Sequence, residues 1–240
     1  MSFFVFFLLF FDFLLFFLFP FSFLTTFLIF LVIVFSKTFH CRWFIGDLVT
    51  GATGFLGSVH TRSLLSSFSP GDLRILAHPS EDVSFYADLG IDIFRRNLAI
   101  PSPLTGIMVD VTTVYHLAAI VVNDSVSREE MFRVNFEGTR ALVDAFLRST
   151  SSERFIFSSS LGVYGFSFPP YPIPETFPLN PQNNYHESKM LAERYLLNAS
   201  STYGFHASAL RNTPIVGPFD TVTFSSRCSS SSYRGCFLPW

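Results

Sequence analysis

A tyrosine and a lysine four positions apart, Tyr185 and Lys189, are the residues of this 240-residue chain best placed for acid–base chemistry. On a helix, positions i and i+4 lie on the same face, so both side chains can point into one cleft. A free tyrosine titrates near a pH of about 10, but a nearby ammonium stabilises the phenolate and lowers that pKa. We therefore expect Lys189 to lower the pKa of Tyr185, and Tyr185 to exchange a proton with a hydroxyl or carbonyl group.

Three glycines spaced three apart, Gly51, Gly54 and Gly57, suggest a second function, the binding of phosphate. They follow the short apolar run Leu48-Val49 and open a stretch with helical character. Glycines at this spacing allow a tight turn and a close approach of the backbone to a ligand, and a helix N-terminus favours an anionic phosphate. A plain strand–turn–helix has the same pattern, so the rest of the chain must decide between the two interpretations.

The elements that would position these residues alternate between strand and helix, which is typical of a parallel α/β sheet. Expected strands cover residues 45–50, 73–77, 92–94, 113–117, 154–158 and 206–211. Expected helices cover 55–67, 83–89, 128–148 and 185–197. Gly46 and Asp47 fit poorly in the first strand, because the strands of such sheets are normally buried on both faces.

Four further stretches follow the glycine loop in order. They are Tyr115-His116-Leu117-Ala118-Ala119, the segment from Phe155 through Ser158-Ser159-Ser160 to Gly165, Tyr185-His186-Glu187-Ser188-Lys189, and Ala209-Leu210-Arg211 through Gly217-Pro218. With the glycines, they resemble the extended short-chain dehydrogenase/reductase family, the NAD(P)-dependent epimerase/dehydratase group, over residues 45–218. The resemblance implies a Rossmann-type doubly wound parallel sheet.

The resemblance also implies catalytic roles. Tyr185 would be the general acid/base while hydride moves to or from a nicotinamide ring, and Lys189 would also hold the nicotinamide ribose. Ser160 would hydrogen-bond the reacting oxygen, with Ser158 and Ser159 as alternatives. His116 is expected to be structural rather than a base. Asn135 matches a position that supports the active site, and helix packing is an equal alternative.

A cofactor site follows from the same resemblance. Its expected members are Gly51, Thr53, Gly54, Phe55, Leu56, Gly57, His78, Asn97, Leu98, Leu117, Ala118, Ala119, Tyr185 and Lys189. The end of the second strand sets the choice between NAD and NADP, because an acid there binds the ribose 2′-hydroxyl and a base accepts a 2′-phosphate. The sequence reads Ala77-His78-Pro79-Ser80. With no carboxylate among these four residues, the sequence leans to NADP over NAD.

The N-terminal residues differ sharply from the rest. Residues 3–35 are an apolar run in which Asp12 is the only charged residue, and many of the 33 phenylalanines lie there. The run exceeds the length of about 20 residues that spans a bilayer. We expect residues 1–36 to contain a single membrane-anchoring helix, with Lys37 and Arg42 keeping the catalytic domain in the cytoplasm. A signal peptide and a low-complexity stretch without function are the alternatives.

Residues 37–44 then form a short join, 45–218 the dinucleotide-binding domain, and 219–240 a Ser-rich tail expected to be disordered. Family members continue beyond the position of Pro218 into a substrate-binding lobe, which this sequence does not match, and Pro214 stands where nucleotide-sugar enzymes often have asparagine.

The activity that the resemblance implies is that of an oxidoreductase, epimerase or dehydratase on a small molecule, either a nucleotide sugar or a sterol- or flavonoid-like alcohol. The alternative is a truncated, catalytically silent dinucleotide-binding protein.

Composition narrows the choice of partners. The net charge is −2 and no basic run is present, which gives no indication of nucleic-acid binding. The cysteines Cys41, Cys228 and Cys236 are too scattered for a disulfide framework, and no Cys/His cluster has zinc spacing, so we expect no metal. A homodimer through the helices after the fourth and fifth strands is possible by family resemblance.

Overall fold

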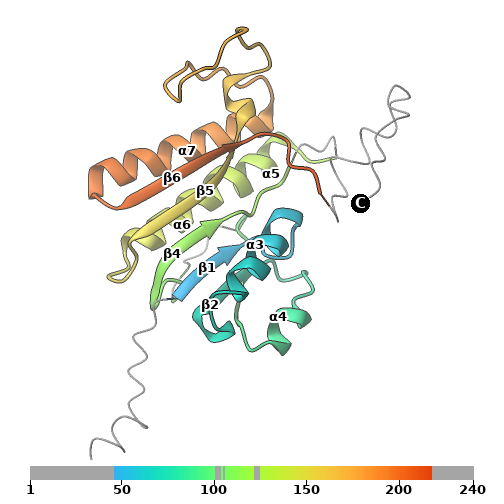
Figure 1. Ribbon diagram of the computed structural model, residues 1–240, viewed down its shortest axis with the longest axis vertical. Helices are drawn as coiled ribbons and strands as arrows, with labels where there is room; N and C mark the ends of the chain where they lie inside the picture. The colour runs from blue at the N-terminus through green and yellow to red at the C-terminus, as the bar shows by residue number, and fades with distance from the viewer. Residues whose placement is uncertain (1–45, 101–103, 105, 122–124, 218–240) are drawn as a thin grey trace, which may run out of the picture. The chain divides into compact units, whose positions relative to one another are not determined.

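The computed structural model of the chain describes residues 46–100, 104, 106–121 and 125–217 (Figure 1). The expected membrane segment, the join and the Ser-rich tail lie outside these residues. Within the described part of the chain, every helix is too short or too polar to traverse a bilayer.

Six parallel strands form one sheet in the order β3-β2-β1-β4-β5-β6 (Figure 1). Their bounds are β1 (Gly46–Thr50), β2 (Leu73–Ala77), β3 (Asp92–Arg95), β4 (Val111–His116), β5 (Arg154–Ser160) and β6 (His206–Asn212). The chain runs outward from β1 to β3 and then returns to β4 and continues outward on the other side. This reversal beside β1 is the doubly wound arrangement that the sequence predicts.

Helices cover the sheet. They are α3 (Phe55–Leu65), α4 (Ser84–Asp88), α5 (Arg128–Phe132), α6 (Gly138–Leu147) and α7 (Asn184–Tyr203), with the 3₁₀ turns η1 (Pro70–Asp72) and η3 (Leu161–Tyr164). One core cluster joins α6 and α7 to Leu48, Val114 and Phe155 on one face of the sheet. A second cluster joins Leu64 of α3 to alternate strand residues, including Ile75, on the other face. Successive side chains along a strand thus point to opposite faces of the sheet and pack into different core clusters.

The single helix expected over 128–148 is interrupted. A π-helical segment, η2 (Arg133–Glu137), separates α5 from α6, and α6 ends at Leu147. Such segments hold an extra residue per turn and are not visible in a pattern of apolar spacing. The last helix is longer than the predicted range of 185–197. The Asn183 side chain accepts a hydrogen bond from the His186 N–H at its start, and Gly204 ends it in a left-handed conformation with φ of 77°.

The first strand is irregular where the sequence suggests it. The pairing of β1 with β4 shifts register between Gly46 and Asp47. Asp47 is buried, and its side chain hydrogen-bonds Thr113. Burial raises the pKa of Asp47, with the bond to Thr113 and the charge of Arg154 acting in the opposite direction. The misfit of Asp47 is therefore accommodated by a polar contact at the amino end of the sheet.

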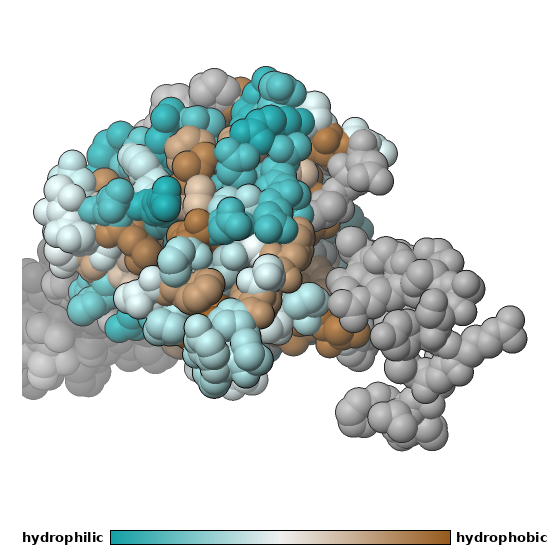
Figure 2. Space-filling view, turned by 90° about the horizontal axis from the view of Figure 1, so that it is seen from above, coloured by the Kyte–Doolittle hydropathy of each residue, from teal (hydrophilic) through white to brown (hydrophobic). Residues whose placement is uncertain are grey.

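Figure 2 looks down on the molecule from above, and on that face hydrophobic residues are interspersed with hydrophilic ones. Some of the exposed large apolar side chains belong to the segment after η3, including Phe166, Phe168 and Tyr171. Scattered exposed apolar residues of this kind are normal on a protein surface.

A buried ion pair joins the last three elements of the fold. Glu193 of α7, only 1% exposed, receives hydrogen bonds from Arg211 of β6, the shortest at 2.5 Å. Its Oε2 atom also accepts from the Ser159 hydroxyl of β5 at 2.6 Å. Arg211 Nη1 also donates to the Tyr164 hydroxyl and to the Glu175 carbonyl oxygen. The ion pair of Glu193 and Arg211 therefore ties together β5, β6, α7 and the loop after η3.

We expect Arg211→Met to destabilise the protein by about 3 kcal/mol, because it leaves the buried Glu193 without its counter-charge. Replacing both partners, as in Glu193→Leu with Arg211→Met, should recover part of that loss. Urea unfolding monitored by circular dichroism measures both effects.

Arg128→Met is the matched control, since its pair with Glu187 is exposed on both sides and should change stability little. Equal losses for Arg211→Met and Arg128→Met would show that burial of the Glu193 pair does not matter.

Candidate active site

The predicted site residues gather at one edge of the sheet. In a parallel sheet all carboxyl ends lie together, and β1, β2, β4 and β5 are paired up to or near their last residues. The glycine loop follows β1, His78 follows β2, Leu117 follows β4, and Ser160 ends β5. This edge beside the reversal of strand order is where open α/β sheets bind ligands.

The glycine loop has the form of a phosphate cradle. Gly54 precedes the first turn of α3 and offers no side-chain cap, so the N–H groups of Phe55 and Leu56 are not used by one. The backbone approach is very close, since a Cβ at Gly57 would lie 1.9 Å from the Gly51 carbonyl oxygen. Thr53 lies in the same turn. The residues present therefore fit the pyrophosphate of a dinucleotide.

The turn after β4 is fastened to the glycine loop by Thr50. The Thr50 hydroxyl oxygen accepts hydrogen bonds from the N–H groups of Leu117 at 3.2 Å and Ala118 at 3.1 Å. Next along the chain, Ala119 precedes Ile120, whose backbone N–H and carbonyl groups both bind the Asn135 side chain. Leu117 and Ala118 are thus held beside the start of the glycine loop.

His116 is a structural residue. Its Nδ1 lies 2.7 Å from the Thr50 hydroxyl and its Nε2 lies 2.8 Å from the Thr139 hydroxyl. The Thr139 hydroxyl donates to the Asn135 carbonyl oxygen, so it accepts from Nε2–H, and Nδ1 is the acceptor. Burial, aided by the charge of Lys189, lowers the pKa of His116 to about 3. The imidazole is therefore neutral at physiological pH, as expected for a non-catalytic histidine.

Asn135 has both of the roles that the sequence left open. It is buried, and its Nδ2 donates to the Ser188 hydroxyl of α7 at 3.1 Å while the same side chain holds Ile120. Ser188 lies between Tyr185 and Lys189 on the helix. Asn135 therefore packs helices together and also positions two parts of the site.

His78, Asn97 and Leu98 occupy the outer part of the same edge. The exposed His78 ring pairs through Nδ1 with the Ser80 hydroxyl at 2.7 Å. Asn97 uses its side-chain oxygen to accept from the Ala99 N–H, so it shapes its own turn. Leu98 packs near Gly138 at the start of α6. His78 follows directly after β2 at this edge, whereas Asn97 and Leu98 shape the turn after β3.

Of the three serines that end β5, Ser159 has its hydroxyl proton engaged, because it donates to Glu193 at 2.6 Å. The Ser158 oxygen accepts from the Asn212 Nδ2 at 3.1 Å, so its proton is left available, as it is at Ser160. The Ser160 oxygen accepts from the Gly162 N–H at 3.2 Å, so its proton can still be donated to a ligand. β5 extends to Ser160 rather than ending at 158, which places this hydroxyl at the tip of the strand.

Tyr185 and Lys189 lie on one face of α7, which packs against β5 and η3. The Lys189 ammonium nitrogen is 4.1 Å from the centre of the Phe157 ring of β5. The ring of His186, next to Tyr185, fills the space that a side chain at Gly162 would need, with atoms 2.2 Å from its Cβ position. The first turn of α7 is thus held against the turn that follows Ser160.

The expected lowering of the Tyr185 pKa is wrong. Burial raises the pKa of Tyr185 above its ordinary value. Burial also lowers the pKa of Lys189 to about 7, partly offset by the charge of Glu193 one turn further along α7. Lys189 is fully buried and Tyr185 partly buried, and burial disfavours the charged form of each side chain.

Sequence reasoning missed Glu193, Arg211 and Thr50. Glu193 had a signal, because it continues the four-residue spacing of Tyr185 and Lys189 and so shares their helix face. Arg211 acts through Glu193 of α7, and Thr50 acts through His116 of β4 and the turn that follows it. These contacts join elements far apart in the sequence, so local spacing does not reveal them.

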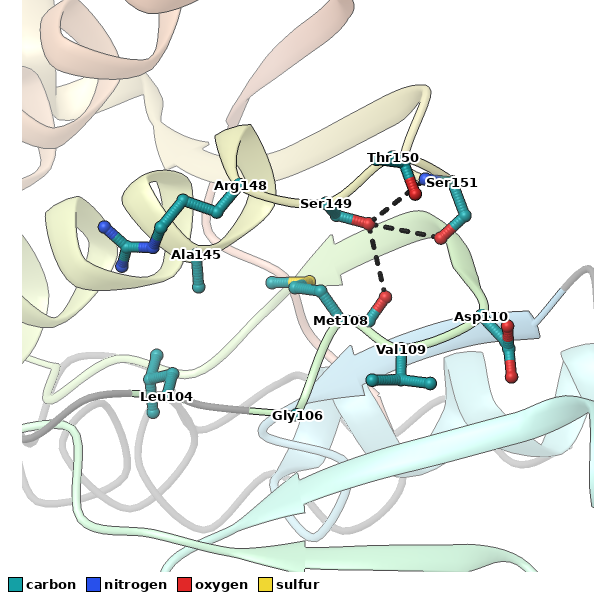
Figure 3. A pocket seen from close by; sticks show the side chains of 10 residues that line it. All are labelled: Leu104, Gly106, Met108, Val109, Asp110, Ala145, Arg148, Ser149, Thr150 and Ser151. Carbon is teal, nitrogen blue, oxygen red and sulfur yellow. Dashed lines mark hydrogen bonds between the residues drawn. The ribbon is translucent and has the colours of Figure 1, made fainter.

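A separate hollow of about 730 Å³ lies at the amino ends of β4 and β5 (Figure 3). Its lining includes Met108, Asp110, Arg148 and Ser149, and the Ser149 hydroxyl bonds the Met108 carbonyl oxygen. None of the predicted site residues lines it, so the chemistry is assigned to the opposite edge of the sheet.

Comparison with known proteins agrees with this geometry. The D-erythronate dehydrogenase of Haemophilus influenzae is 30% identical over 161 residues, which cover 66% of this chain and 50% of that protein. The sterol demethylase protein B of Methylococcus capsulatus is 29% identical over 176 residues, covering 72% of this chain and 52% of that protein. The chain thus spans about half the length of the curated relatives it matches.

A solved structure shares the fold. The UDP-glucose 4-epimerase of Thermus thermophilus in complex with NAD superposes with a TM-score of 0.59 and 28% identity, over 70% of this chain and 54% of that one. The family model of the NAD dependent epimerase/dehydratase family matches residues 48–235. That match includes the glycine loop, Ser160, Tyr185 and Lys189, and the chain therefore belongs to the NAD dependent epimerase/dehydratase family.

Proposed function

We propose that the protein is an NAD(P)-dependent oxidoreductase, epimerase or dehydratase that acts on a hydroxyl or keto group of a small molecule. The observation that carries the proposal is that α7, which bears Tyr185 and Lys189 on one face, packs against β5 and η3, where Ser160 ends the strand. The η3 turn lies at the same sheet edge as the glycine loop. A dinucleotide held by the loop would extend along this edge toward the two side chains.

Each residue has a distinct role in the proposed reaction. The bound nicotinamide dinucleotide would supply or accept the hydride. Because burial raises its pKa, the Tyr185 phenol is protonated at neutral pH and can donate its proton to a substrate oxygen. The Ser160 hydroxyl would donate a hydrogen bond to the same oxygen. Lys189, buried beside Phe157, would hold the cofactor ribose and contribute positive charge near the phenol.

For the substrate class, a nucleotide sugar is favoured by the likeness to the UDP-glucose 4-epimerase, and a sterol-like alcohol by the likeness to the sterol demethylase protein B. The second candidate function is a catalytically silent dinucleotide-binding protein. Such a protein would hold the dinucleotide at the glycine loop without turning over a substrate.

Titration of the full chain with NADH and NADPH, followed by cofactor fluorescence, tests the proposal. Binding of at least one is expected. Binding of neither would overturn both the enzyme and the silent binding protein. Binding without turnover on any hydroxyl or keto substrate of these classes would favour the silent protein.

We expect Tyr185→Phe to abolish turnover while leaving dinucleotide affinity within about twofold, because the ring is kept and only the transferable proton is lost. Steady-state kinetics and the same fluorescence titration measure the two quantities. His206→Phe, at an exposed position on β6, is a control in which both should stay unchanged. A large loss of affinity in Tyr185→Phe would mean that the hydroxyl has a structural role.

We also expect the difference in the free energy of unfolding between Lys189→Met and the wild type to depend on pH. The pKa of Lys189 is lowered to about 7 in the folded chain, while the unfolded side chain titrates near a pH of about 10.4. The burial cost to the wild type is then fully present below pH ~7 and is lost as the pH rises through the unfolded value.

The advantage of Lys189→Met should accordingly shrink by up to about 1.4 kcal/mol per pH unit between these limits. Urea unfolding of both proteins at several pH values across this window provides the measurement. A difference that stays constant across the window would mean that Lys189 keeps an ordinary pKa.

A further inference from the structure

The turn that follows β2 places a carboxylate where the sequence alone shows none. The Glu81 N–H donates to the His78 carbonyl oxygen at 3.0 Å, which folds residues 78–81 into a closed turn. The Glu81 side chain then returns over this turn, and its Oε2 accepts from the His78 N–H at 2.9 Å. Glu81 is four residues past the end of β2 at Ala77, yet its carboxylate is fixed at the strand end.

The position of this turn relative to the glycine loop is also fixed. β1 and β2 are parallel neighbours, with Thr50 aligned to Leu76, so their following loops leave the same edge side by side. The Tyr86 hydroxyl of α4, just beyond the turn, donates to the Ala52 carbonyl oxygen of the glycine loop at 2.7 Å. A dinucleotide bound by the glycine loop would carry its adenosine ribose past the end of β2.

From this geometry we propose that Glu81 makes the site select NAD and reject NADP. The inference rests on the proposed function, because it assumes that a dinucleotide occupies the glycine loop. A carboxylate at the end of β2 can accept hydrogen bonds from the ribose 2′-hydroxyl and repels a 2′-phosphate. Glu81 also uses the His78 N–H, a backbone donor that a phosphate would otherwise take.

The neighbouring cationic and polar groups are engaged in holding the turn. Arg95, at the end of β3, donates from Nη1 to the backbone carbonyl oxygens of Pro79 and Glu81, each at 3.0 Å. The His78 ring pairs with the Ser80 hydroxyl. Asp82 adds a second carboxylate nearby, bound to the N–H and hydroxyl of Ser84. Residues 77–80 contain no acid, and for that reason the sequence favours NADP. The turn offsets this absence because it brings the Glu81 carboxylate to the end of β2.

Calorimetric titration of the full chain with NADH and NADPH tests the inference. We expect NADH to bind at least about tenfold more tightly than NADPH, the size expected for a close like-charge contact. AMP and adenosine 2′,5′-bisphosphate, which differ at the 2′ position without the nicotinamide half, should bind in the same order. NADPH binding as tightly as NADH would overturn the role of Glu81 and leave the proposed function standing. Binding of neither dinucleotide would overturn both.

Glu81→Gln isolates the charge, since it keeps an oxygen that can accept from the His78 N–H. We define the gap as the ratio of the NADPH dissociation constant to the NADH dissociation constant. We expect the variant to narrow this gap by about tenfold, mainly because NADPH binds more tightly. Glu153→Gln makes the same change of net charge at an exposed position before β5, at the far edge of the sheet, and should leave the gap unchanged. An unchanged gap in Glu81→Gln, with an unchanged thermal midpoint, would also overturn the proposal. If the variant fails to fold, the wild-type preferences for the dinucleotides and the two fragments still decide.

Discussion

The carboxylate of Glu193 is the group on which the geometry of the site depends most. It is almost fully buried and is bound by a guanidinium from β6 and a hydroxyl from β5. A buried ion pair gains little net stability, because desolvation offsets the attraction, but it tolerates few alternative arrangements. Its partners Ser159 and Arg211 lie at aligned positions on paired strands. The contact therefore fixes the depth of α7 relative to the tips of β5 and β6, and Ser160 and Lys189 are positioned with them.

The same burial sets the protonation states along α7. Burial disfavours the ammonium form of Lys189 and lowers its pKa, while the Glu193 carboxylate favours that form. Burial raises the pKa of Tyr185. At neutral pH Tyr185 is therefore a protonated acid, and Lys189 is a buried amine whose ammonium form is stabilised by Glu193. The simple picture of a lysine acidifying its neighbour on the helix does not apply.

The sequence predicts much of the fold because each strand and helix carries its own local signal. The parallel strands and the glycine turn follow from apolar runs and glycine spacing, and the ends of β2 were predicted to the residue. The helical position of Tyr185 follows from its four-residue separation from Lys189. The interruption at 133–137 was missed because apolar spacing does not reveal an extra residue in a helix. The pKa direction of Tyr185 was wrong because burial is a property of packing. The carboxylate of Glu81 was overlooked because a turn, rather than adjacency, brings it to the strand end.

The π-helical segment also affects how this chain should be aligned with its relatives. A π turn contains one residue more than an α turn, so it is an insertion that the helix absorbs without a loop. Here it lies between α5 and α6 and contains Asn135, which faces Ile120 and Ser188. A relative whose helix is regular at this point would align correctly only with a one-residue gap inside 133–137. A gap placed elsewhere would shift Asn135 and Thr139 onto the wrong helix faces and conceal their correspondence.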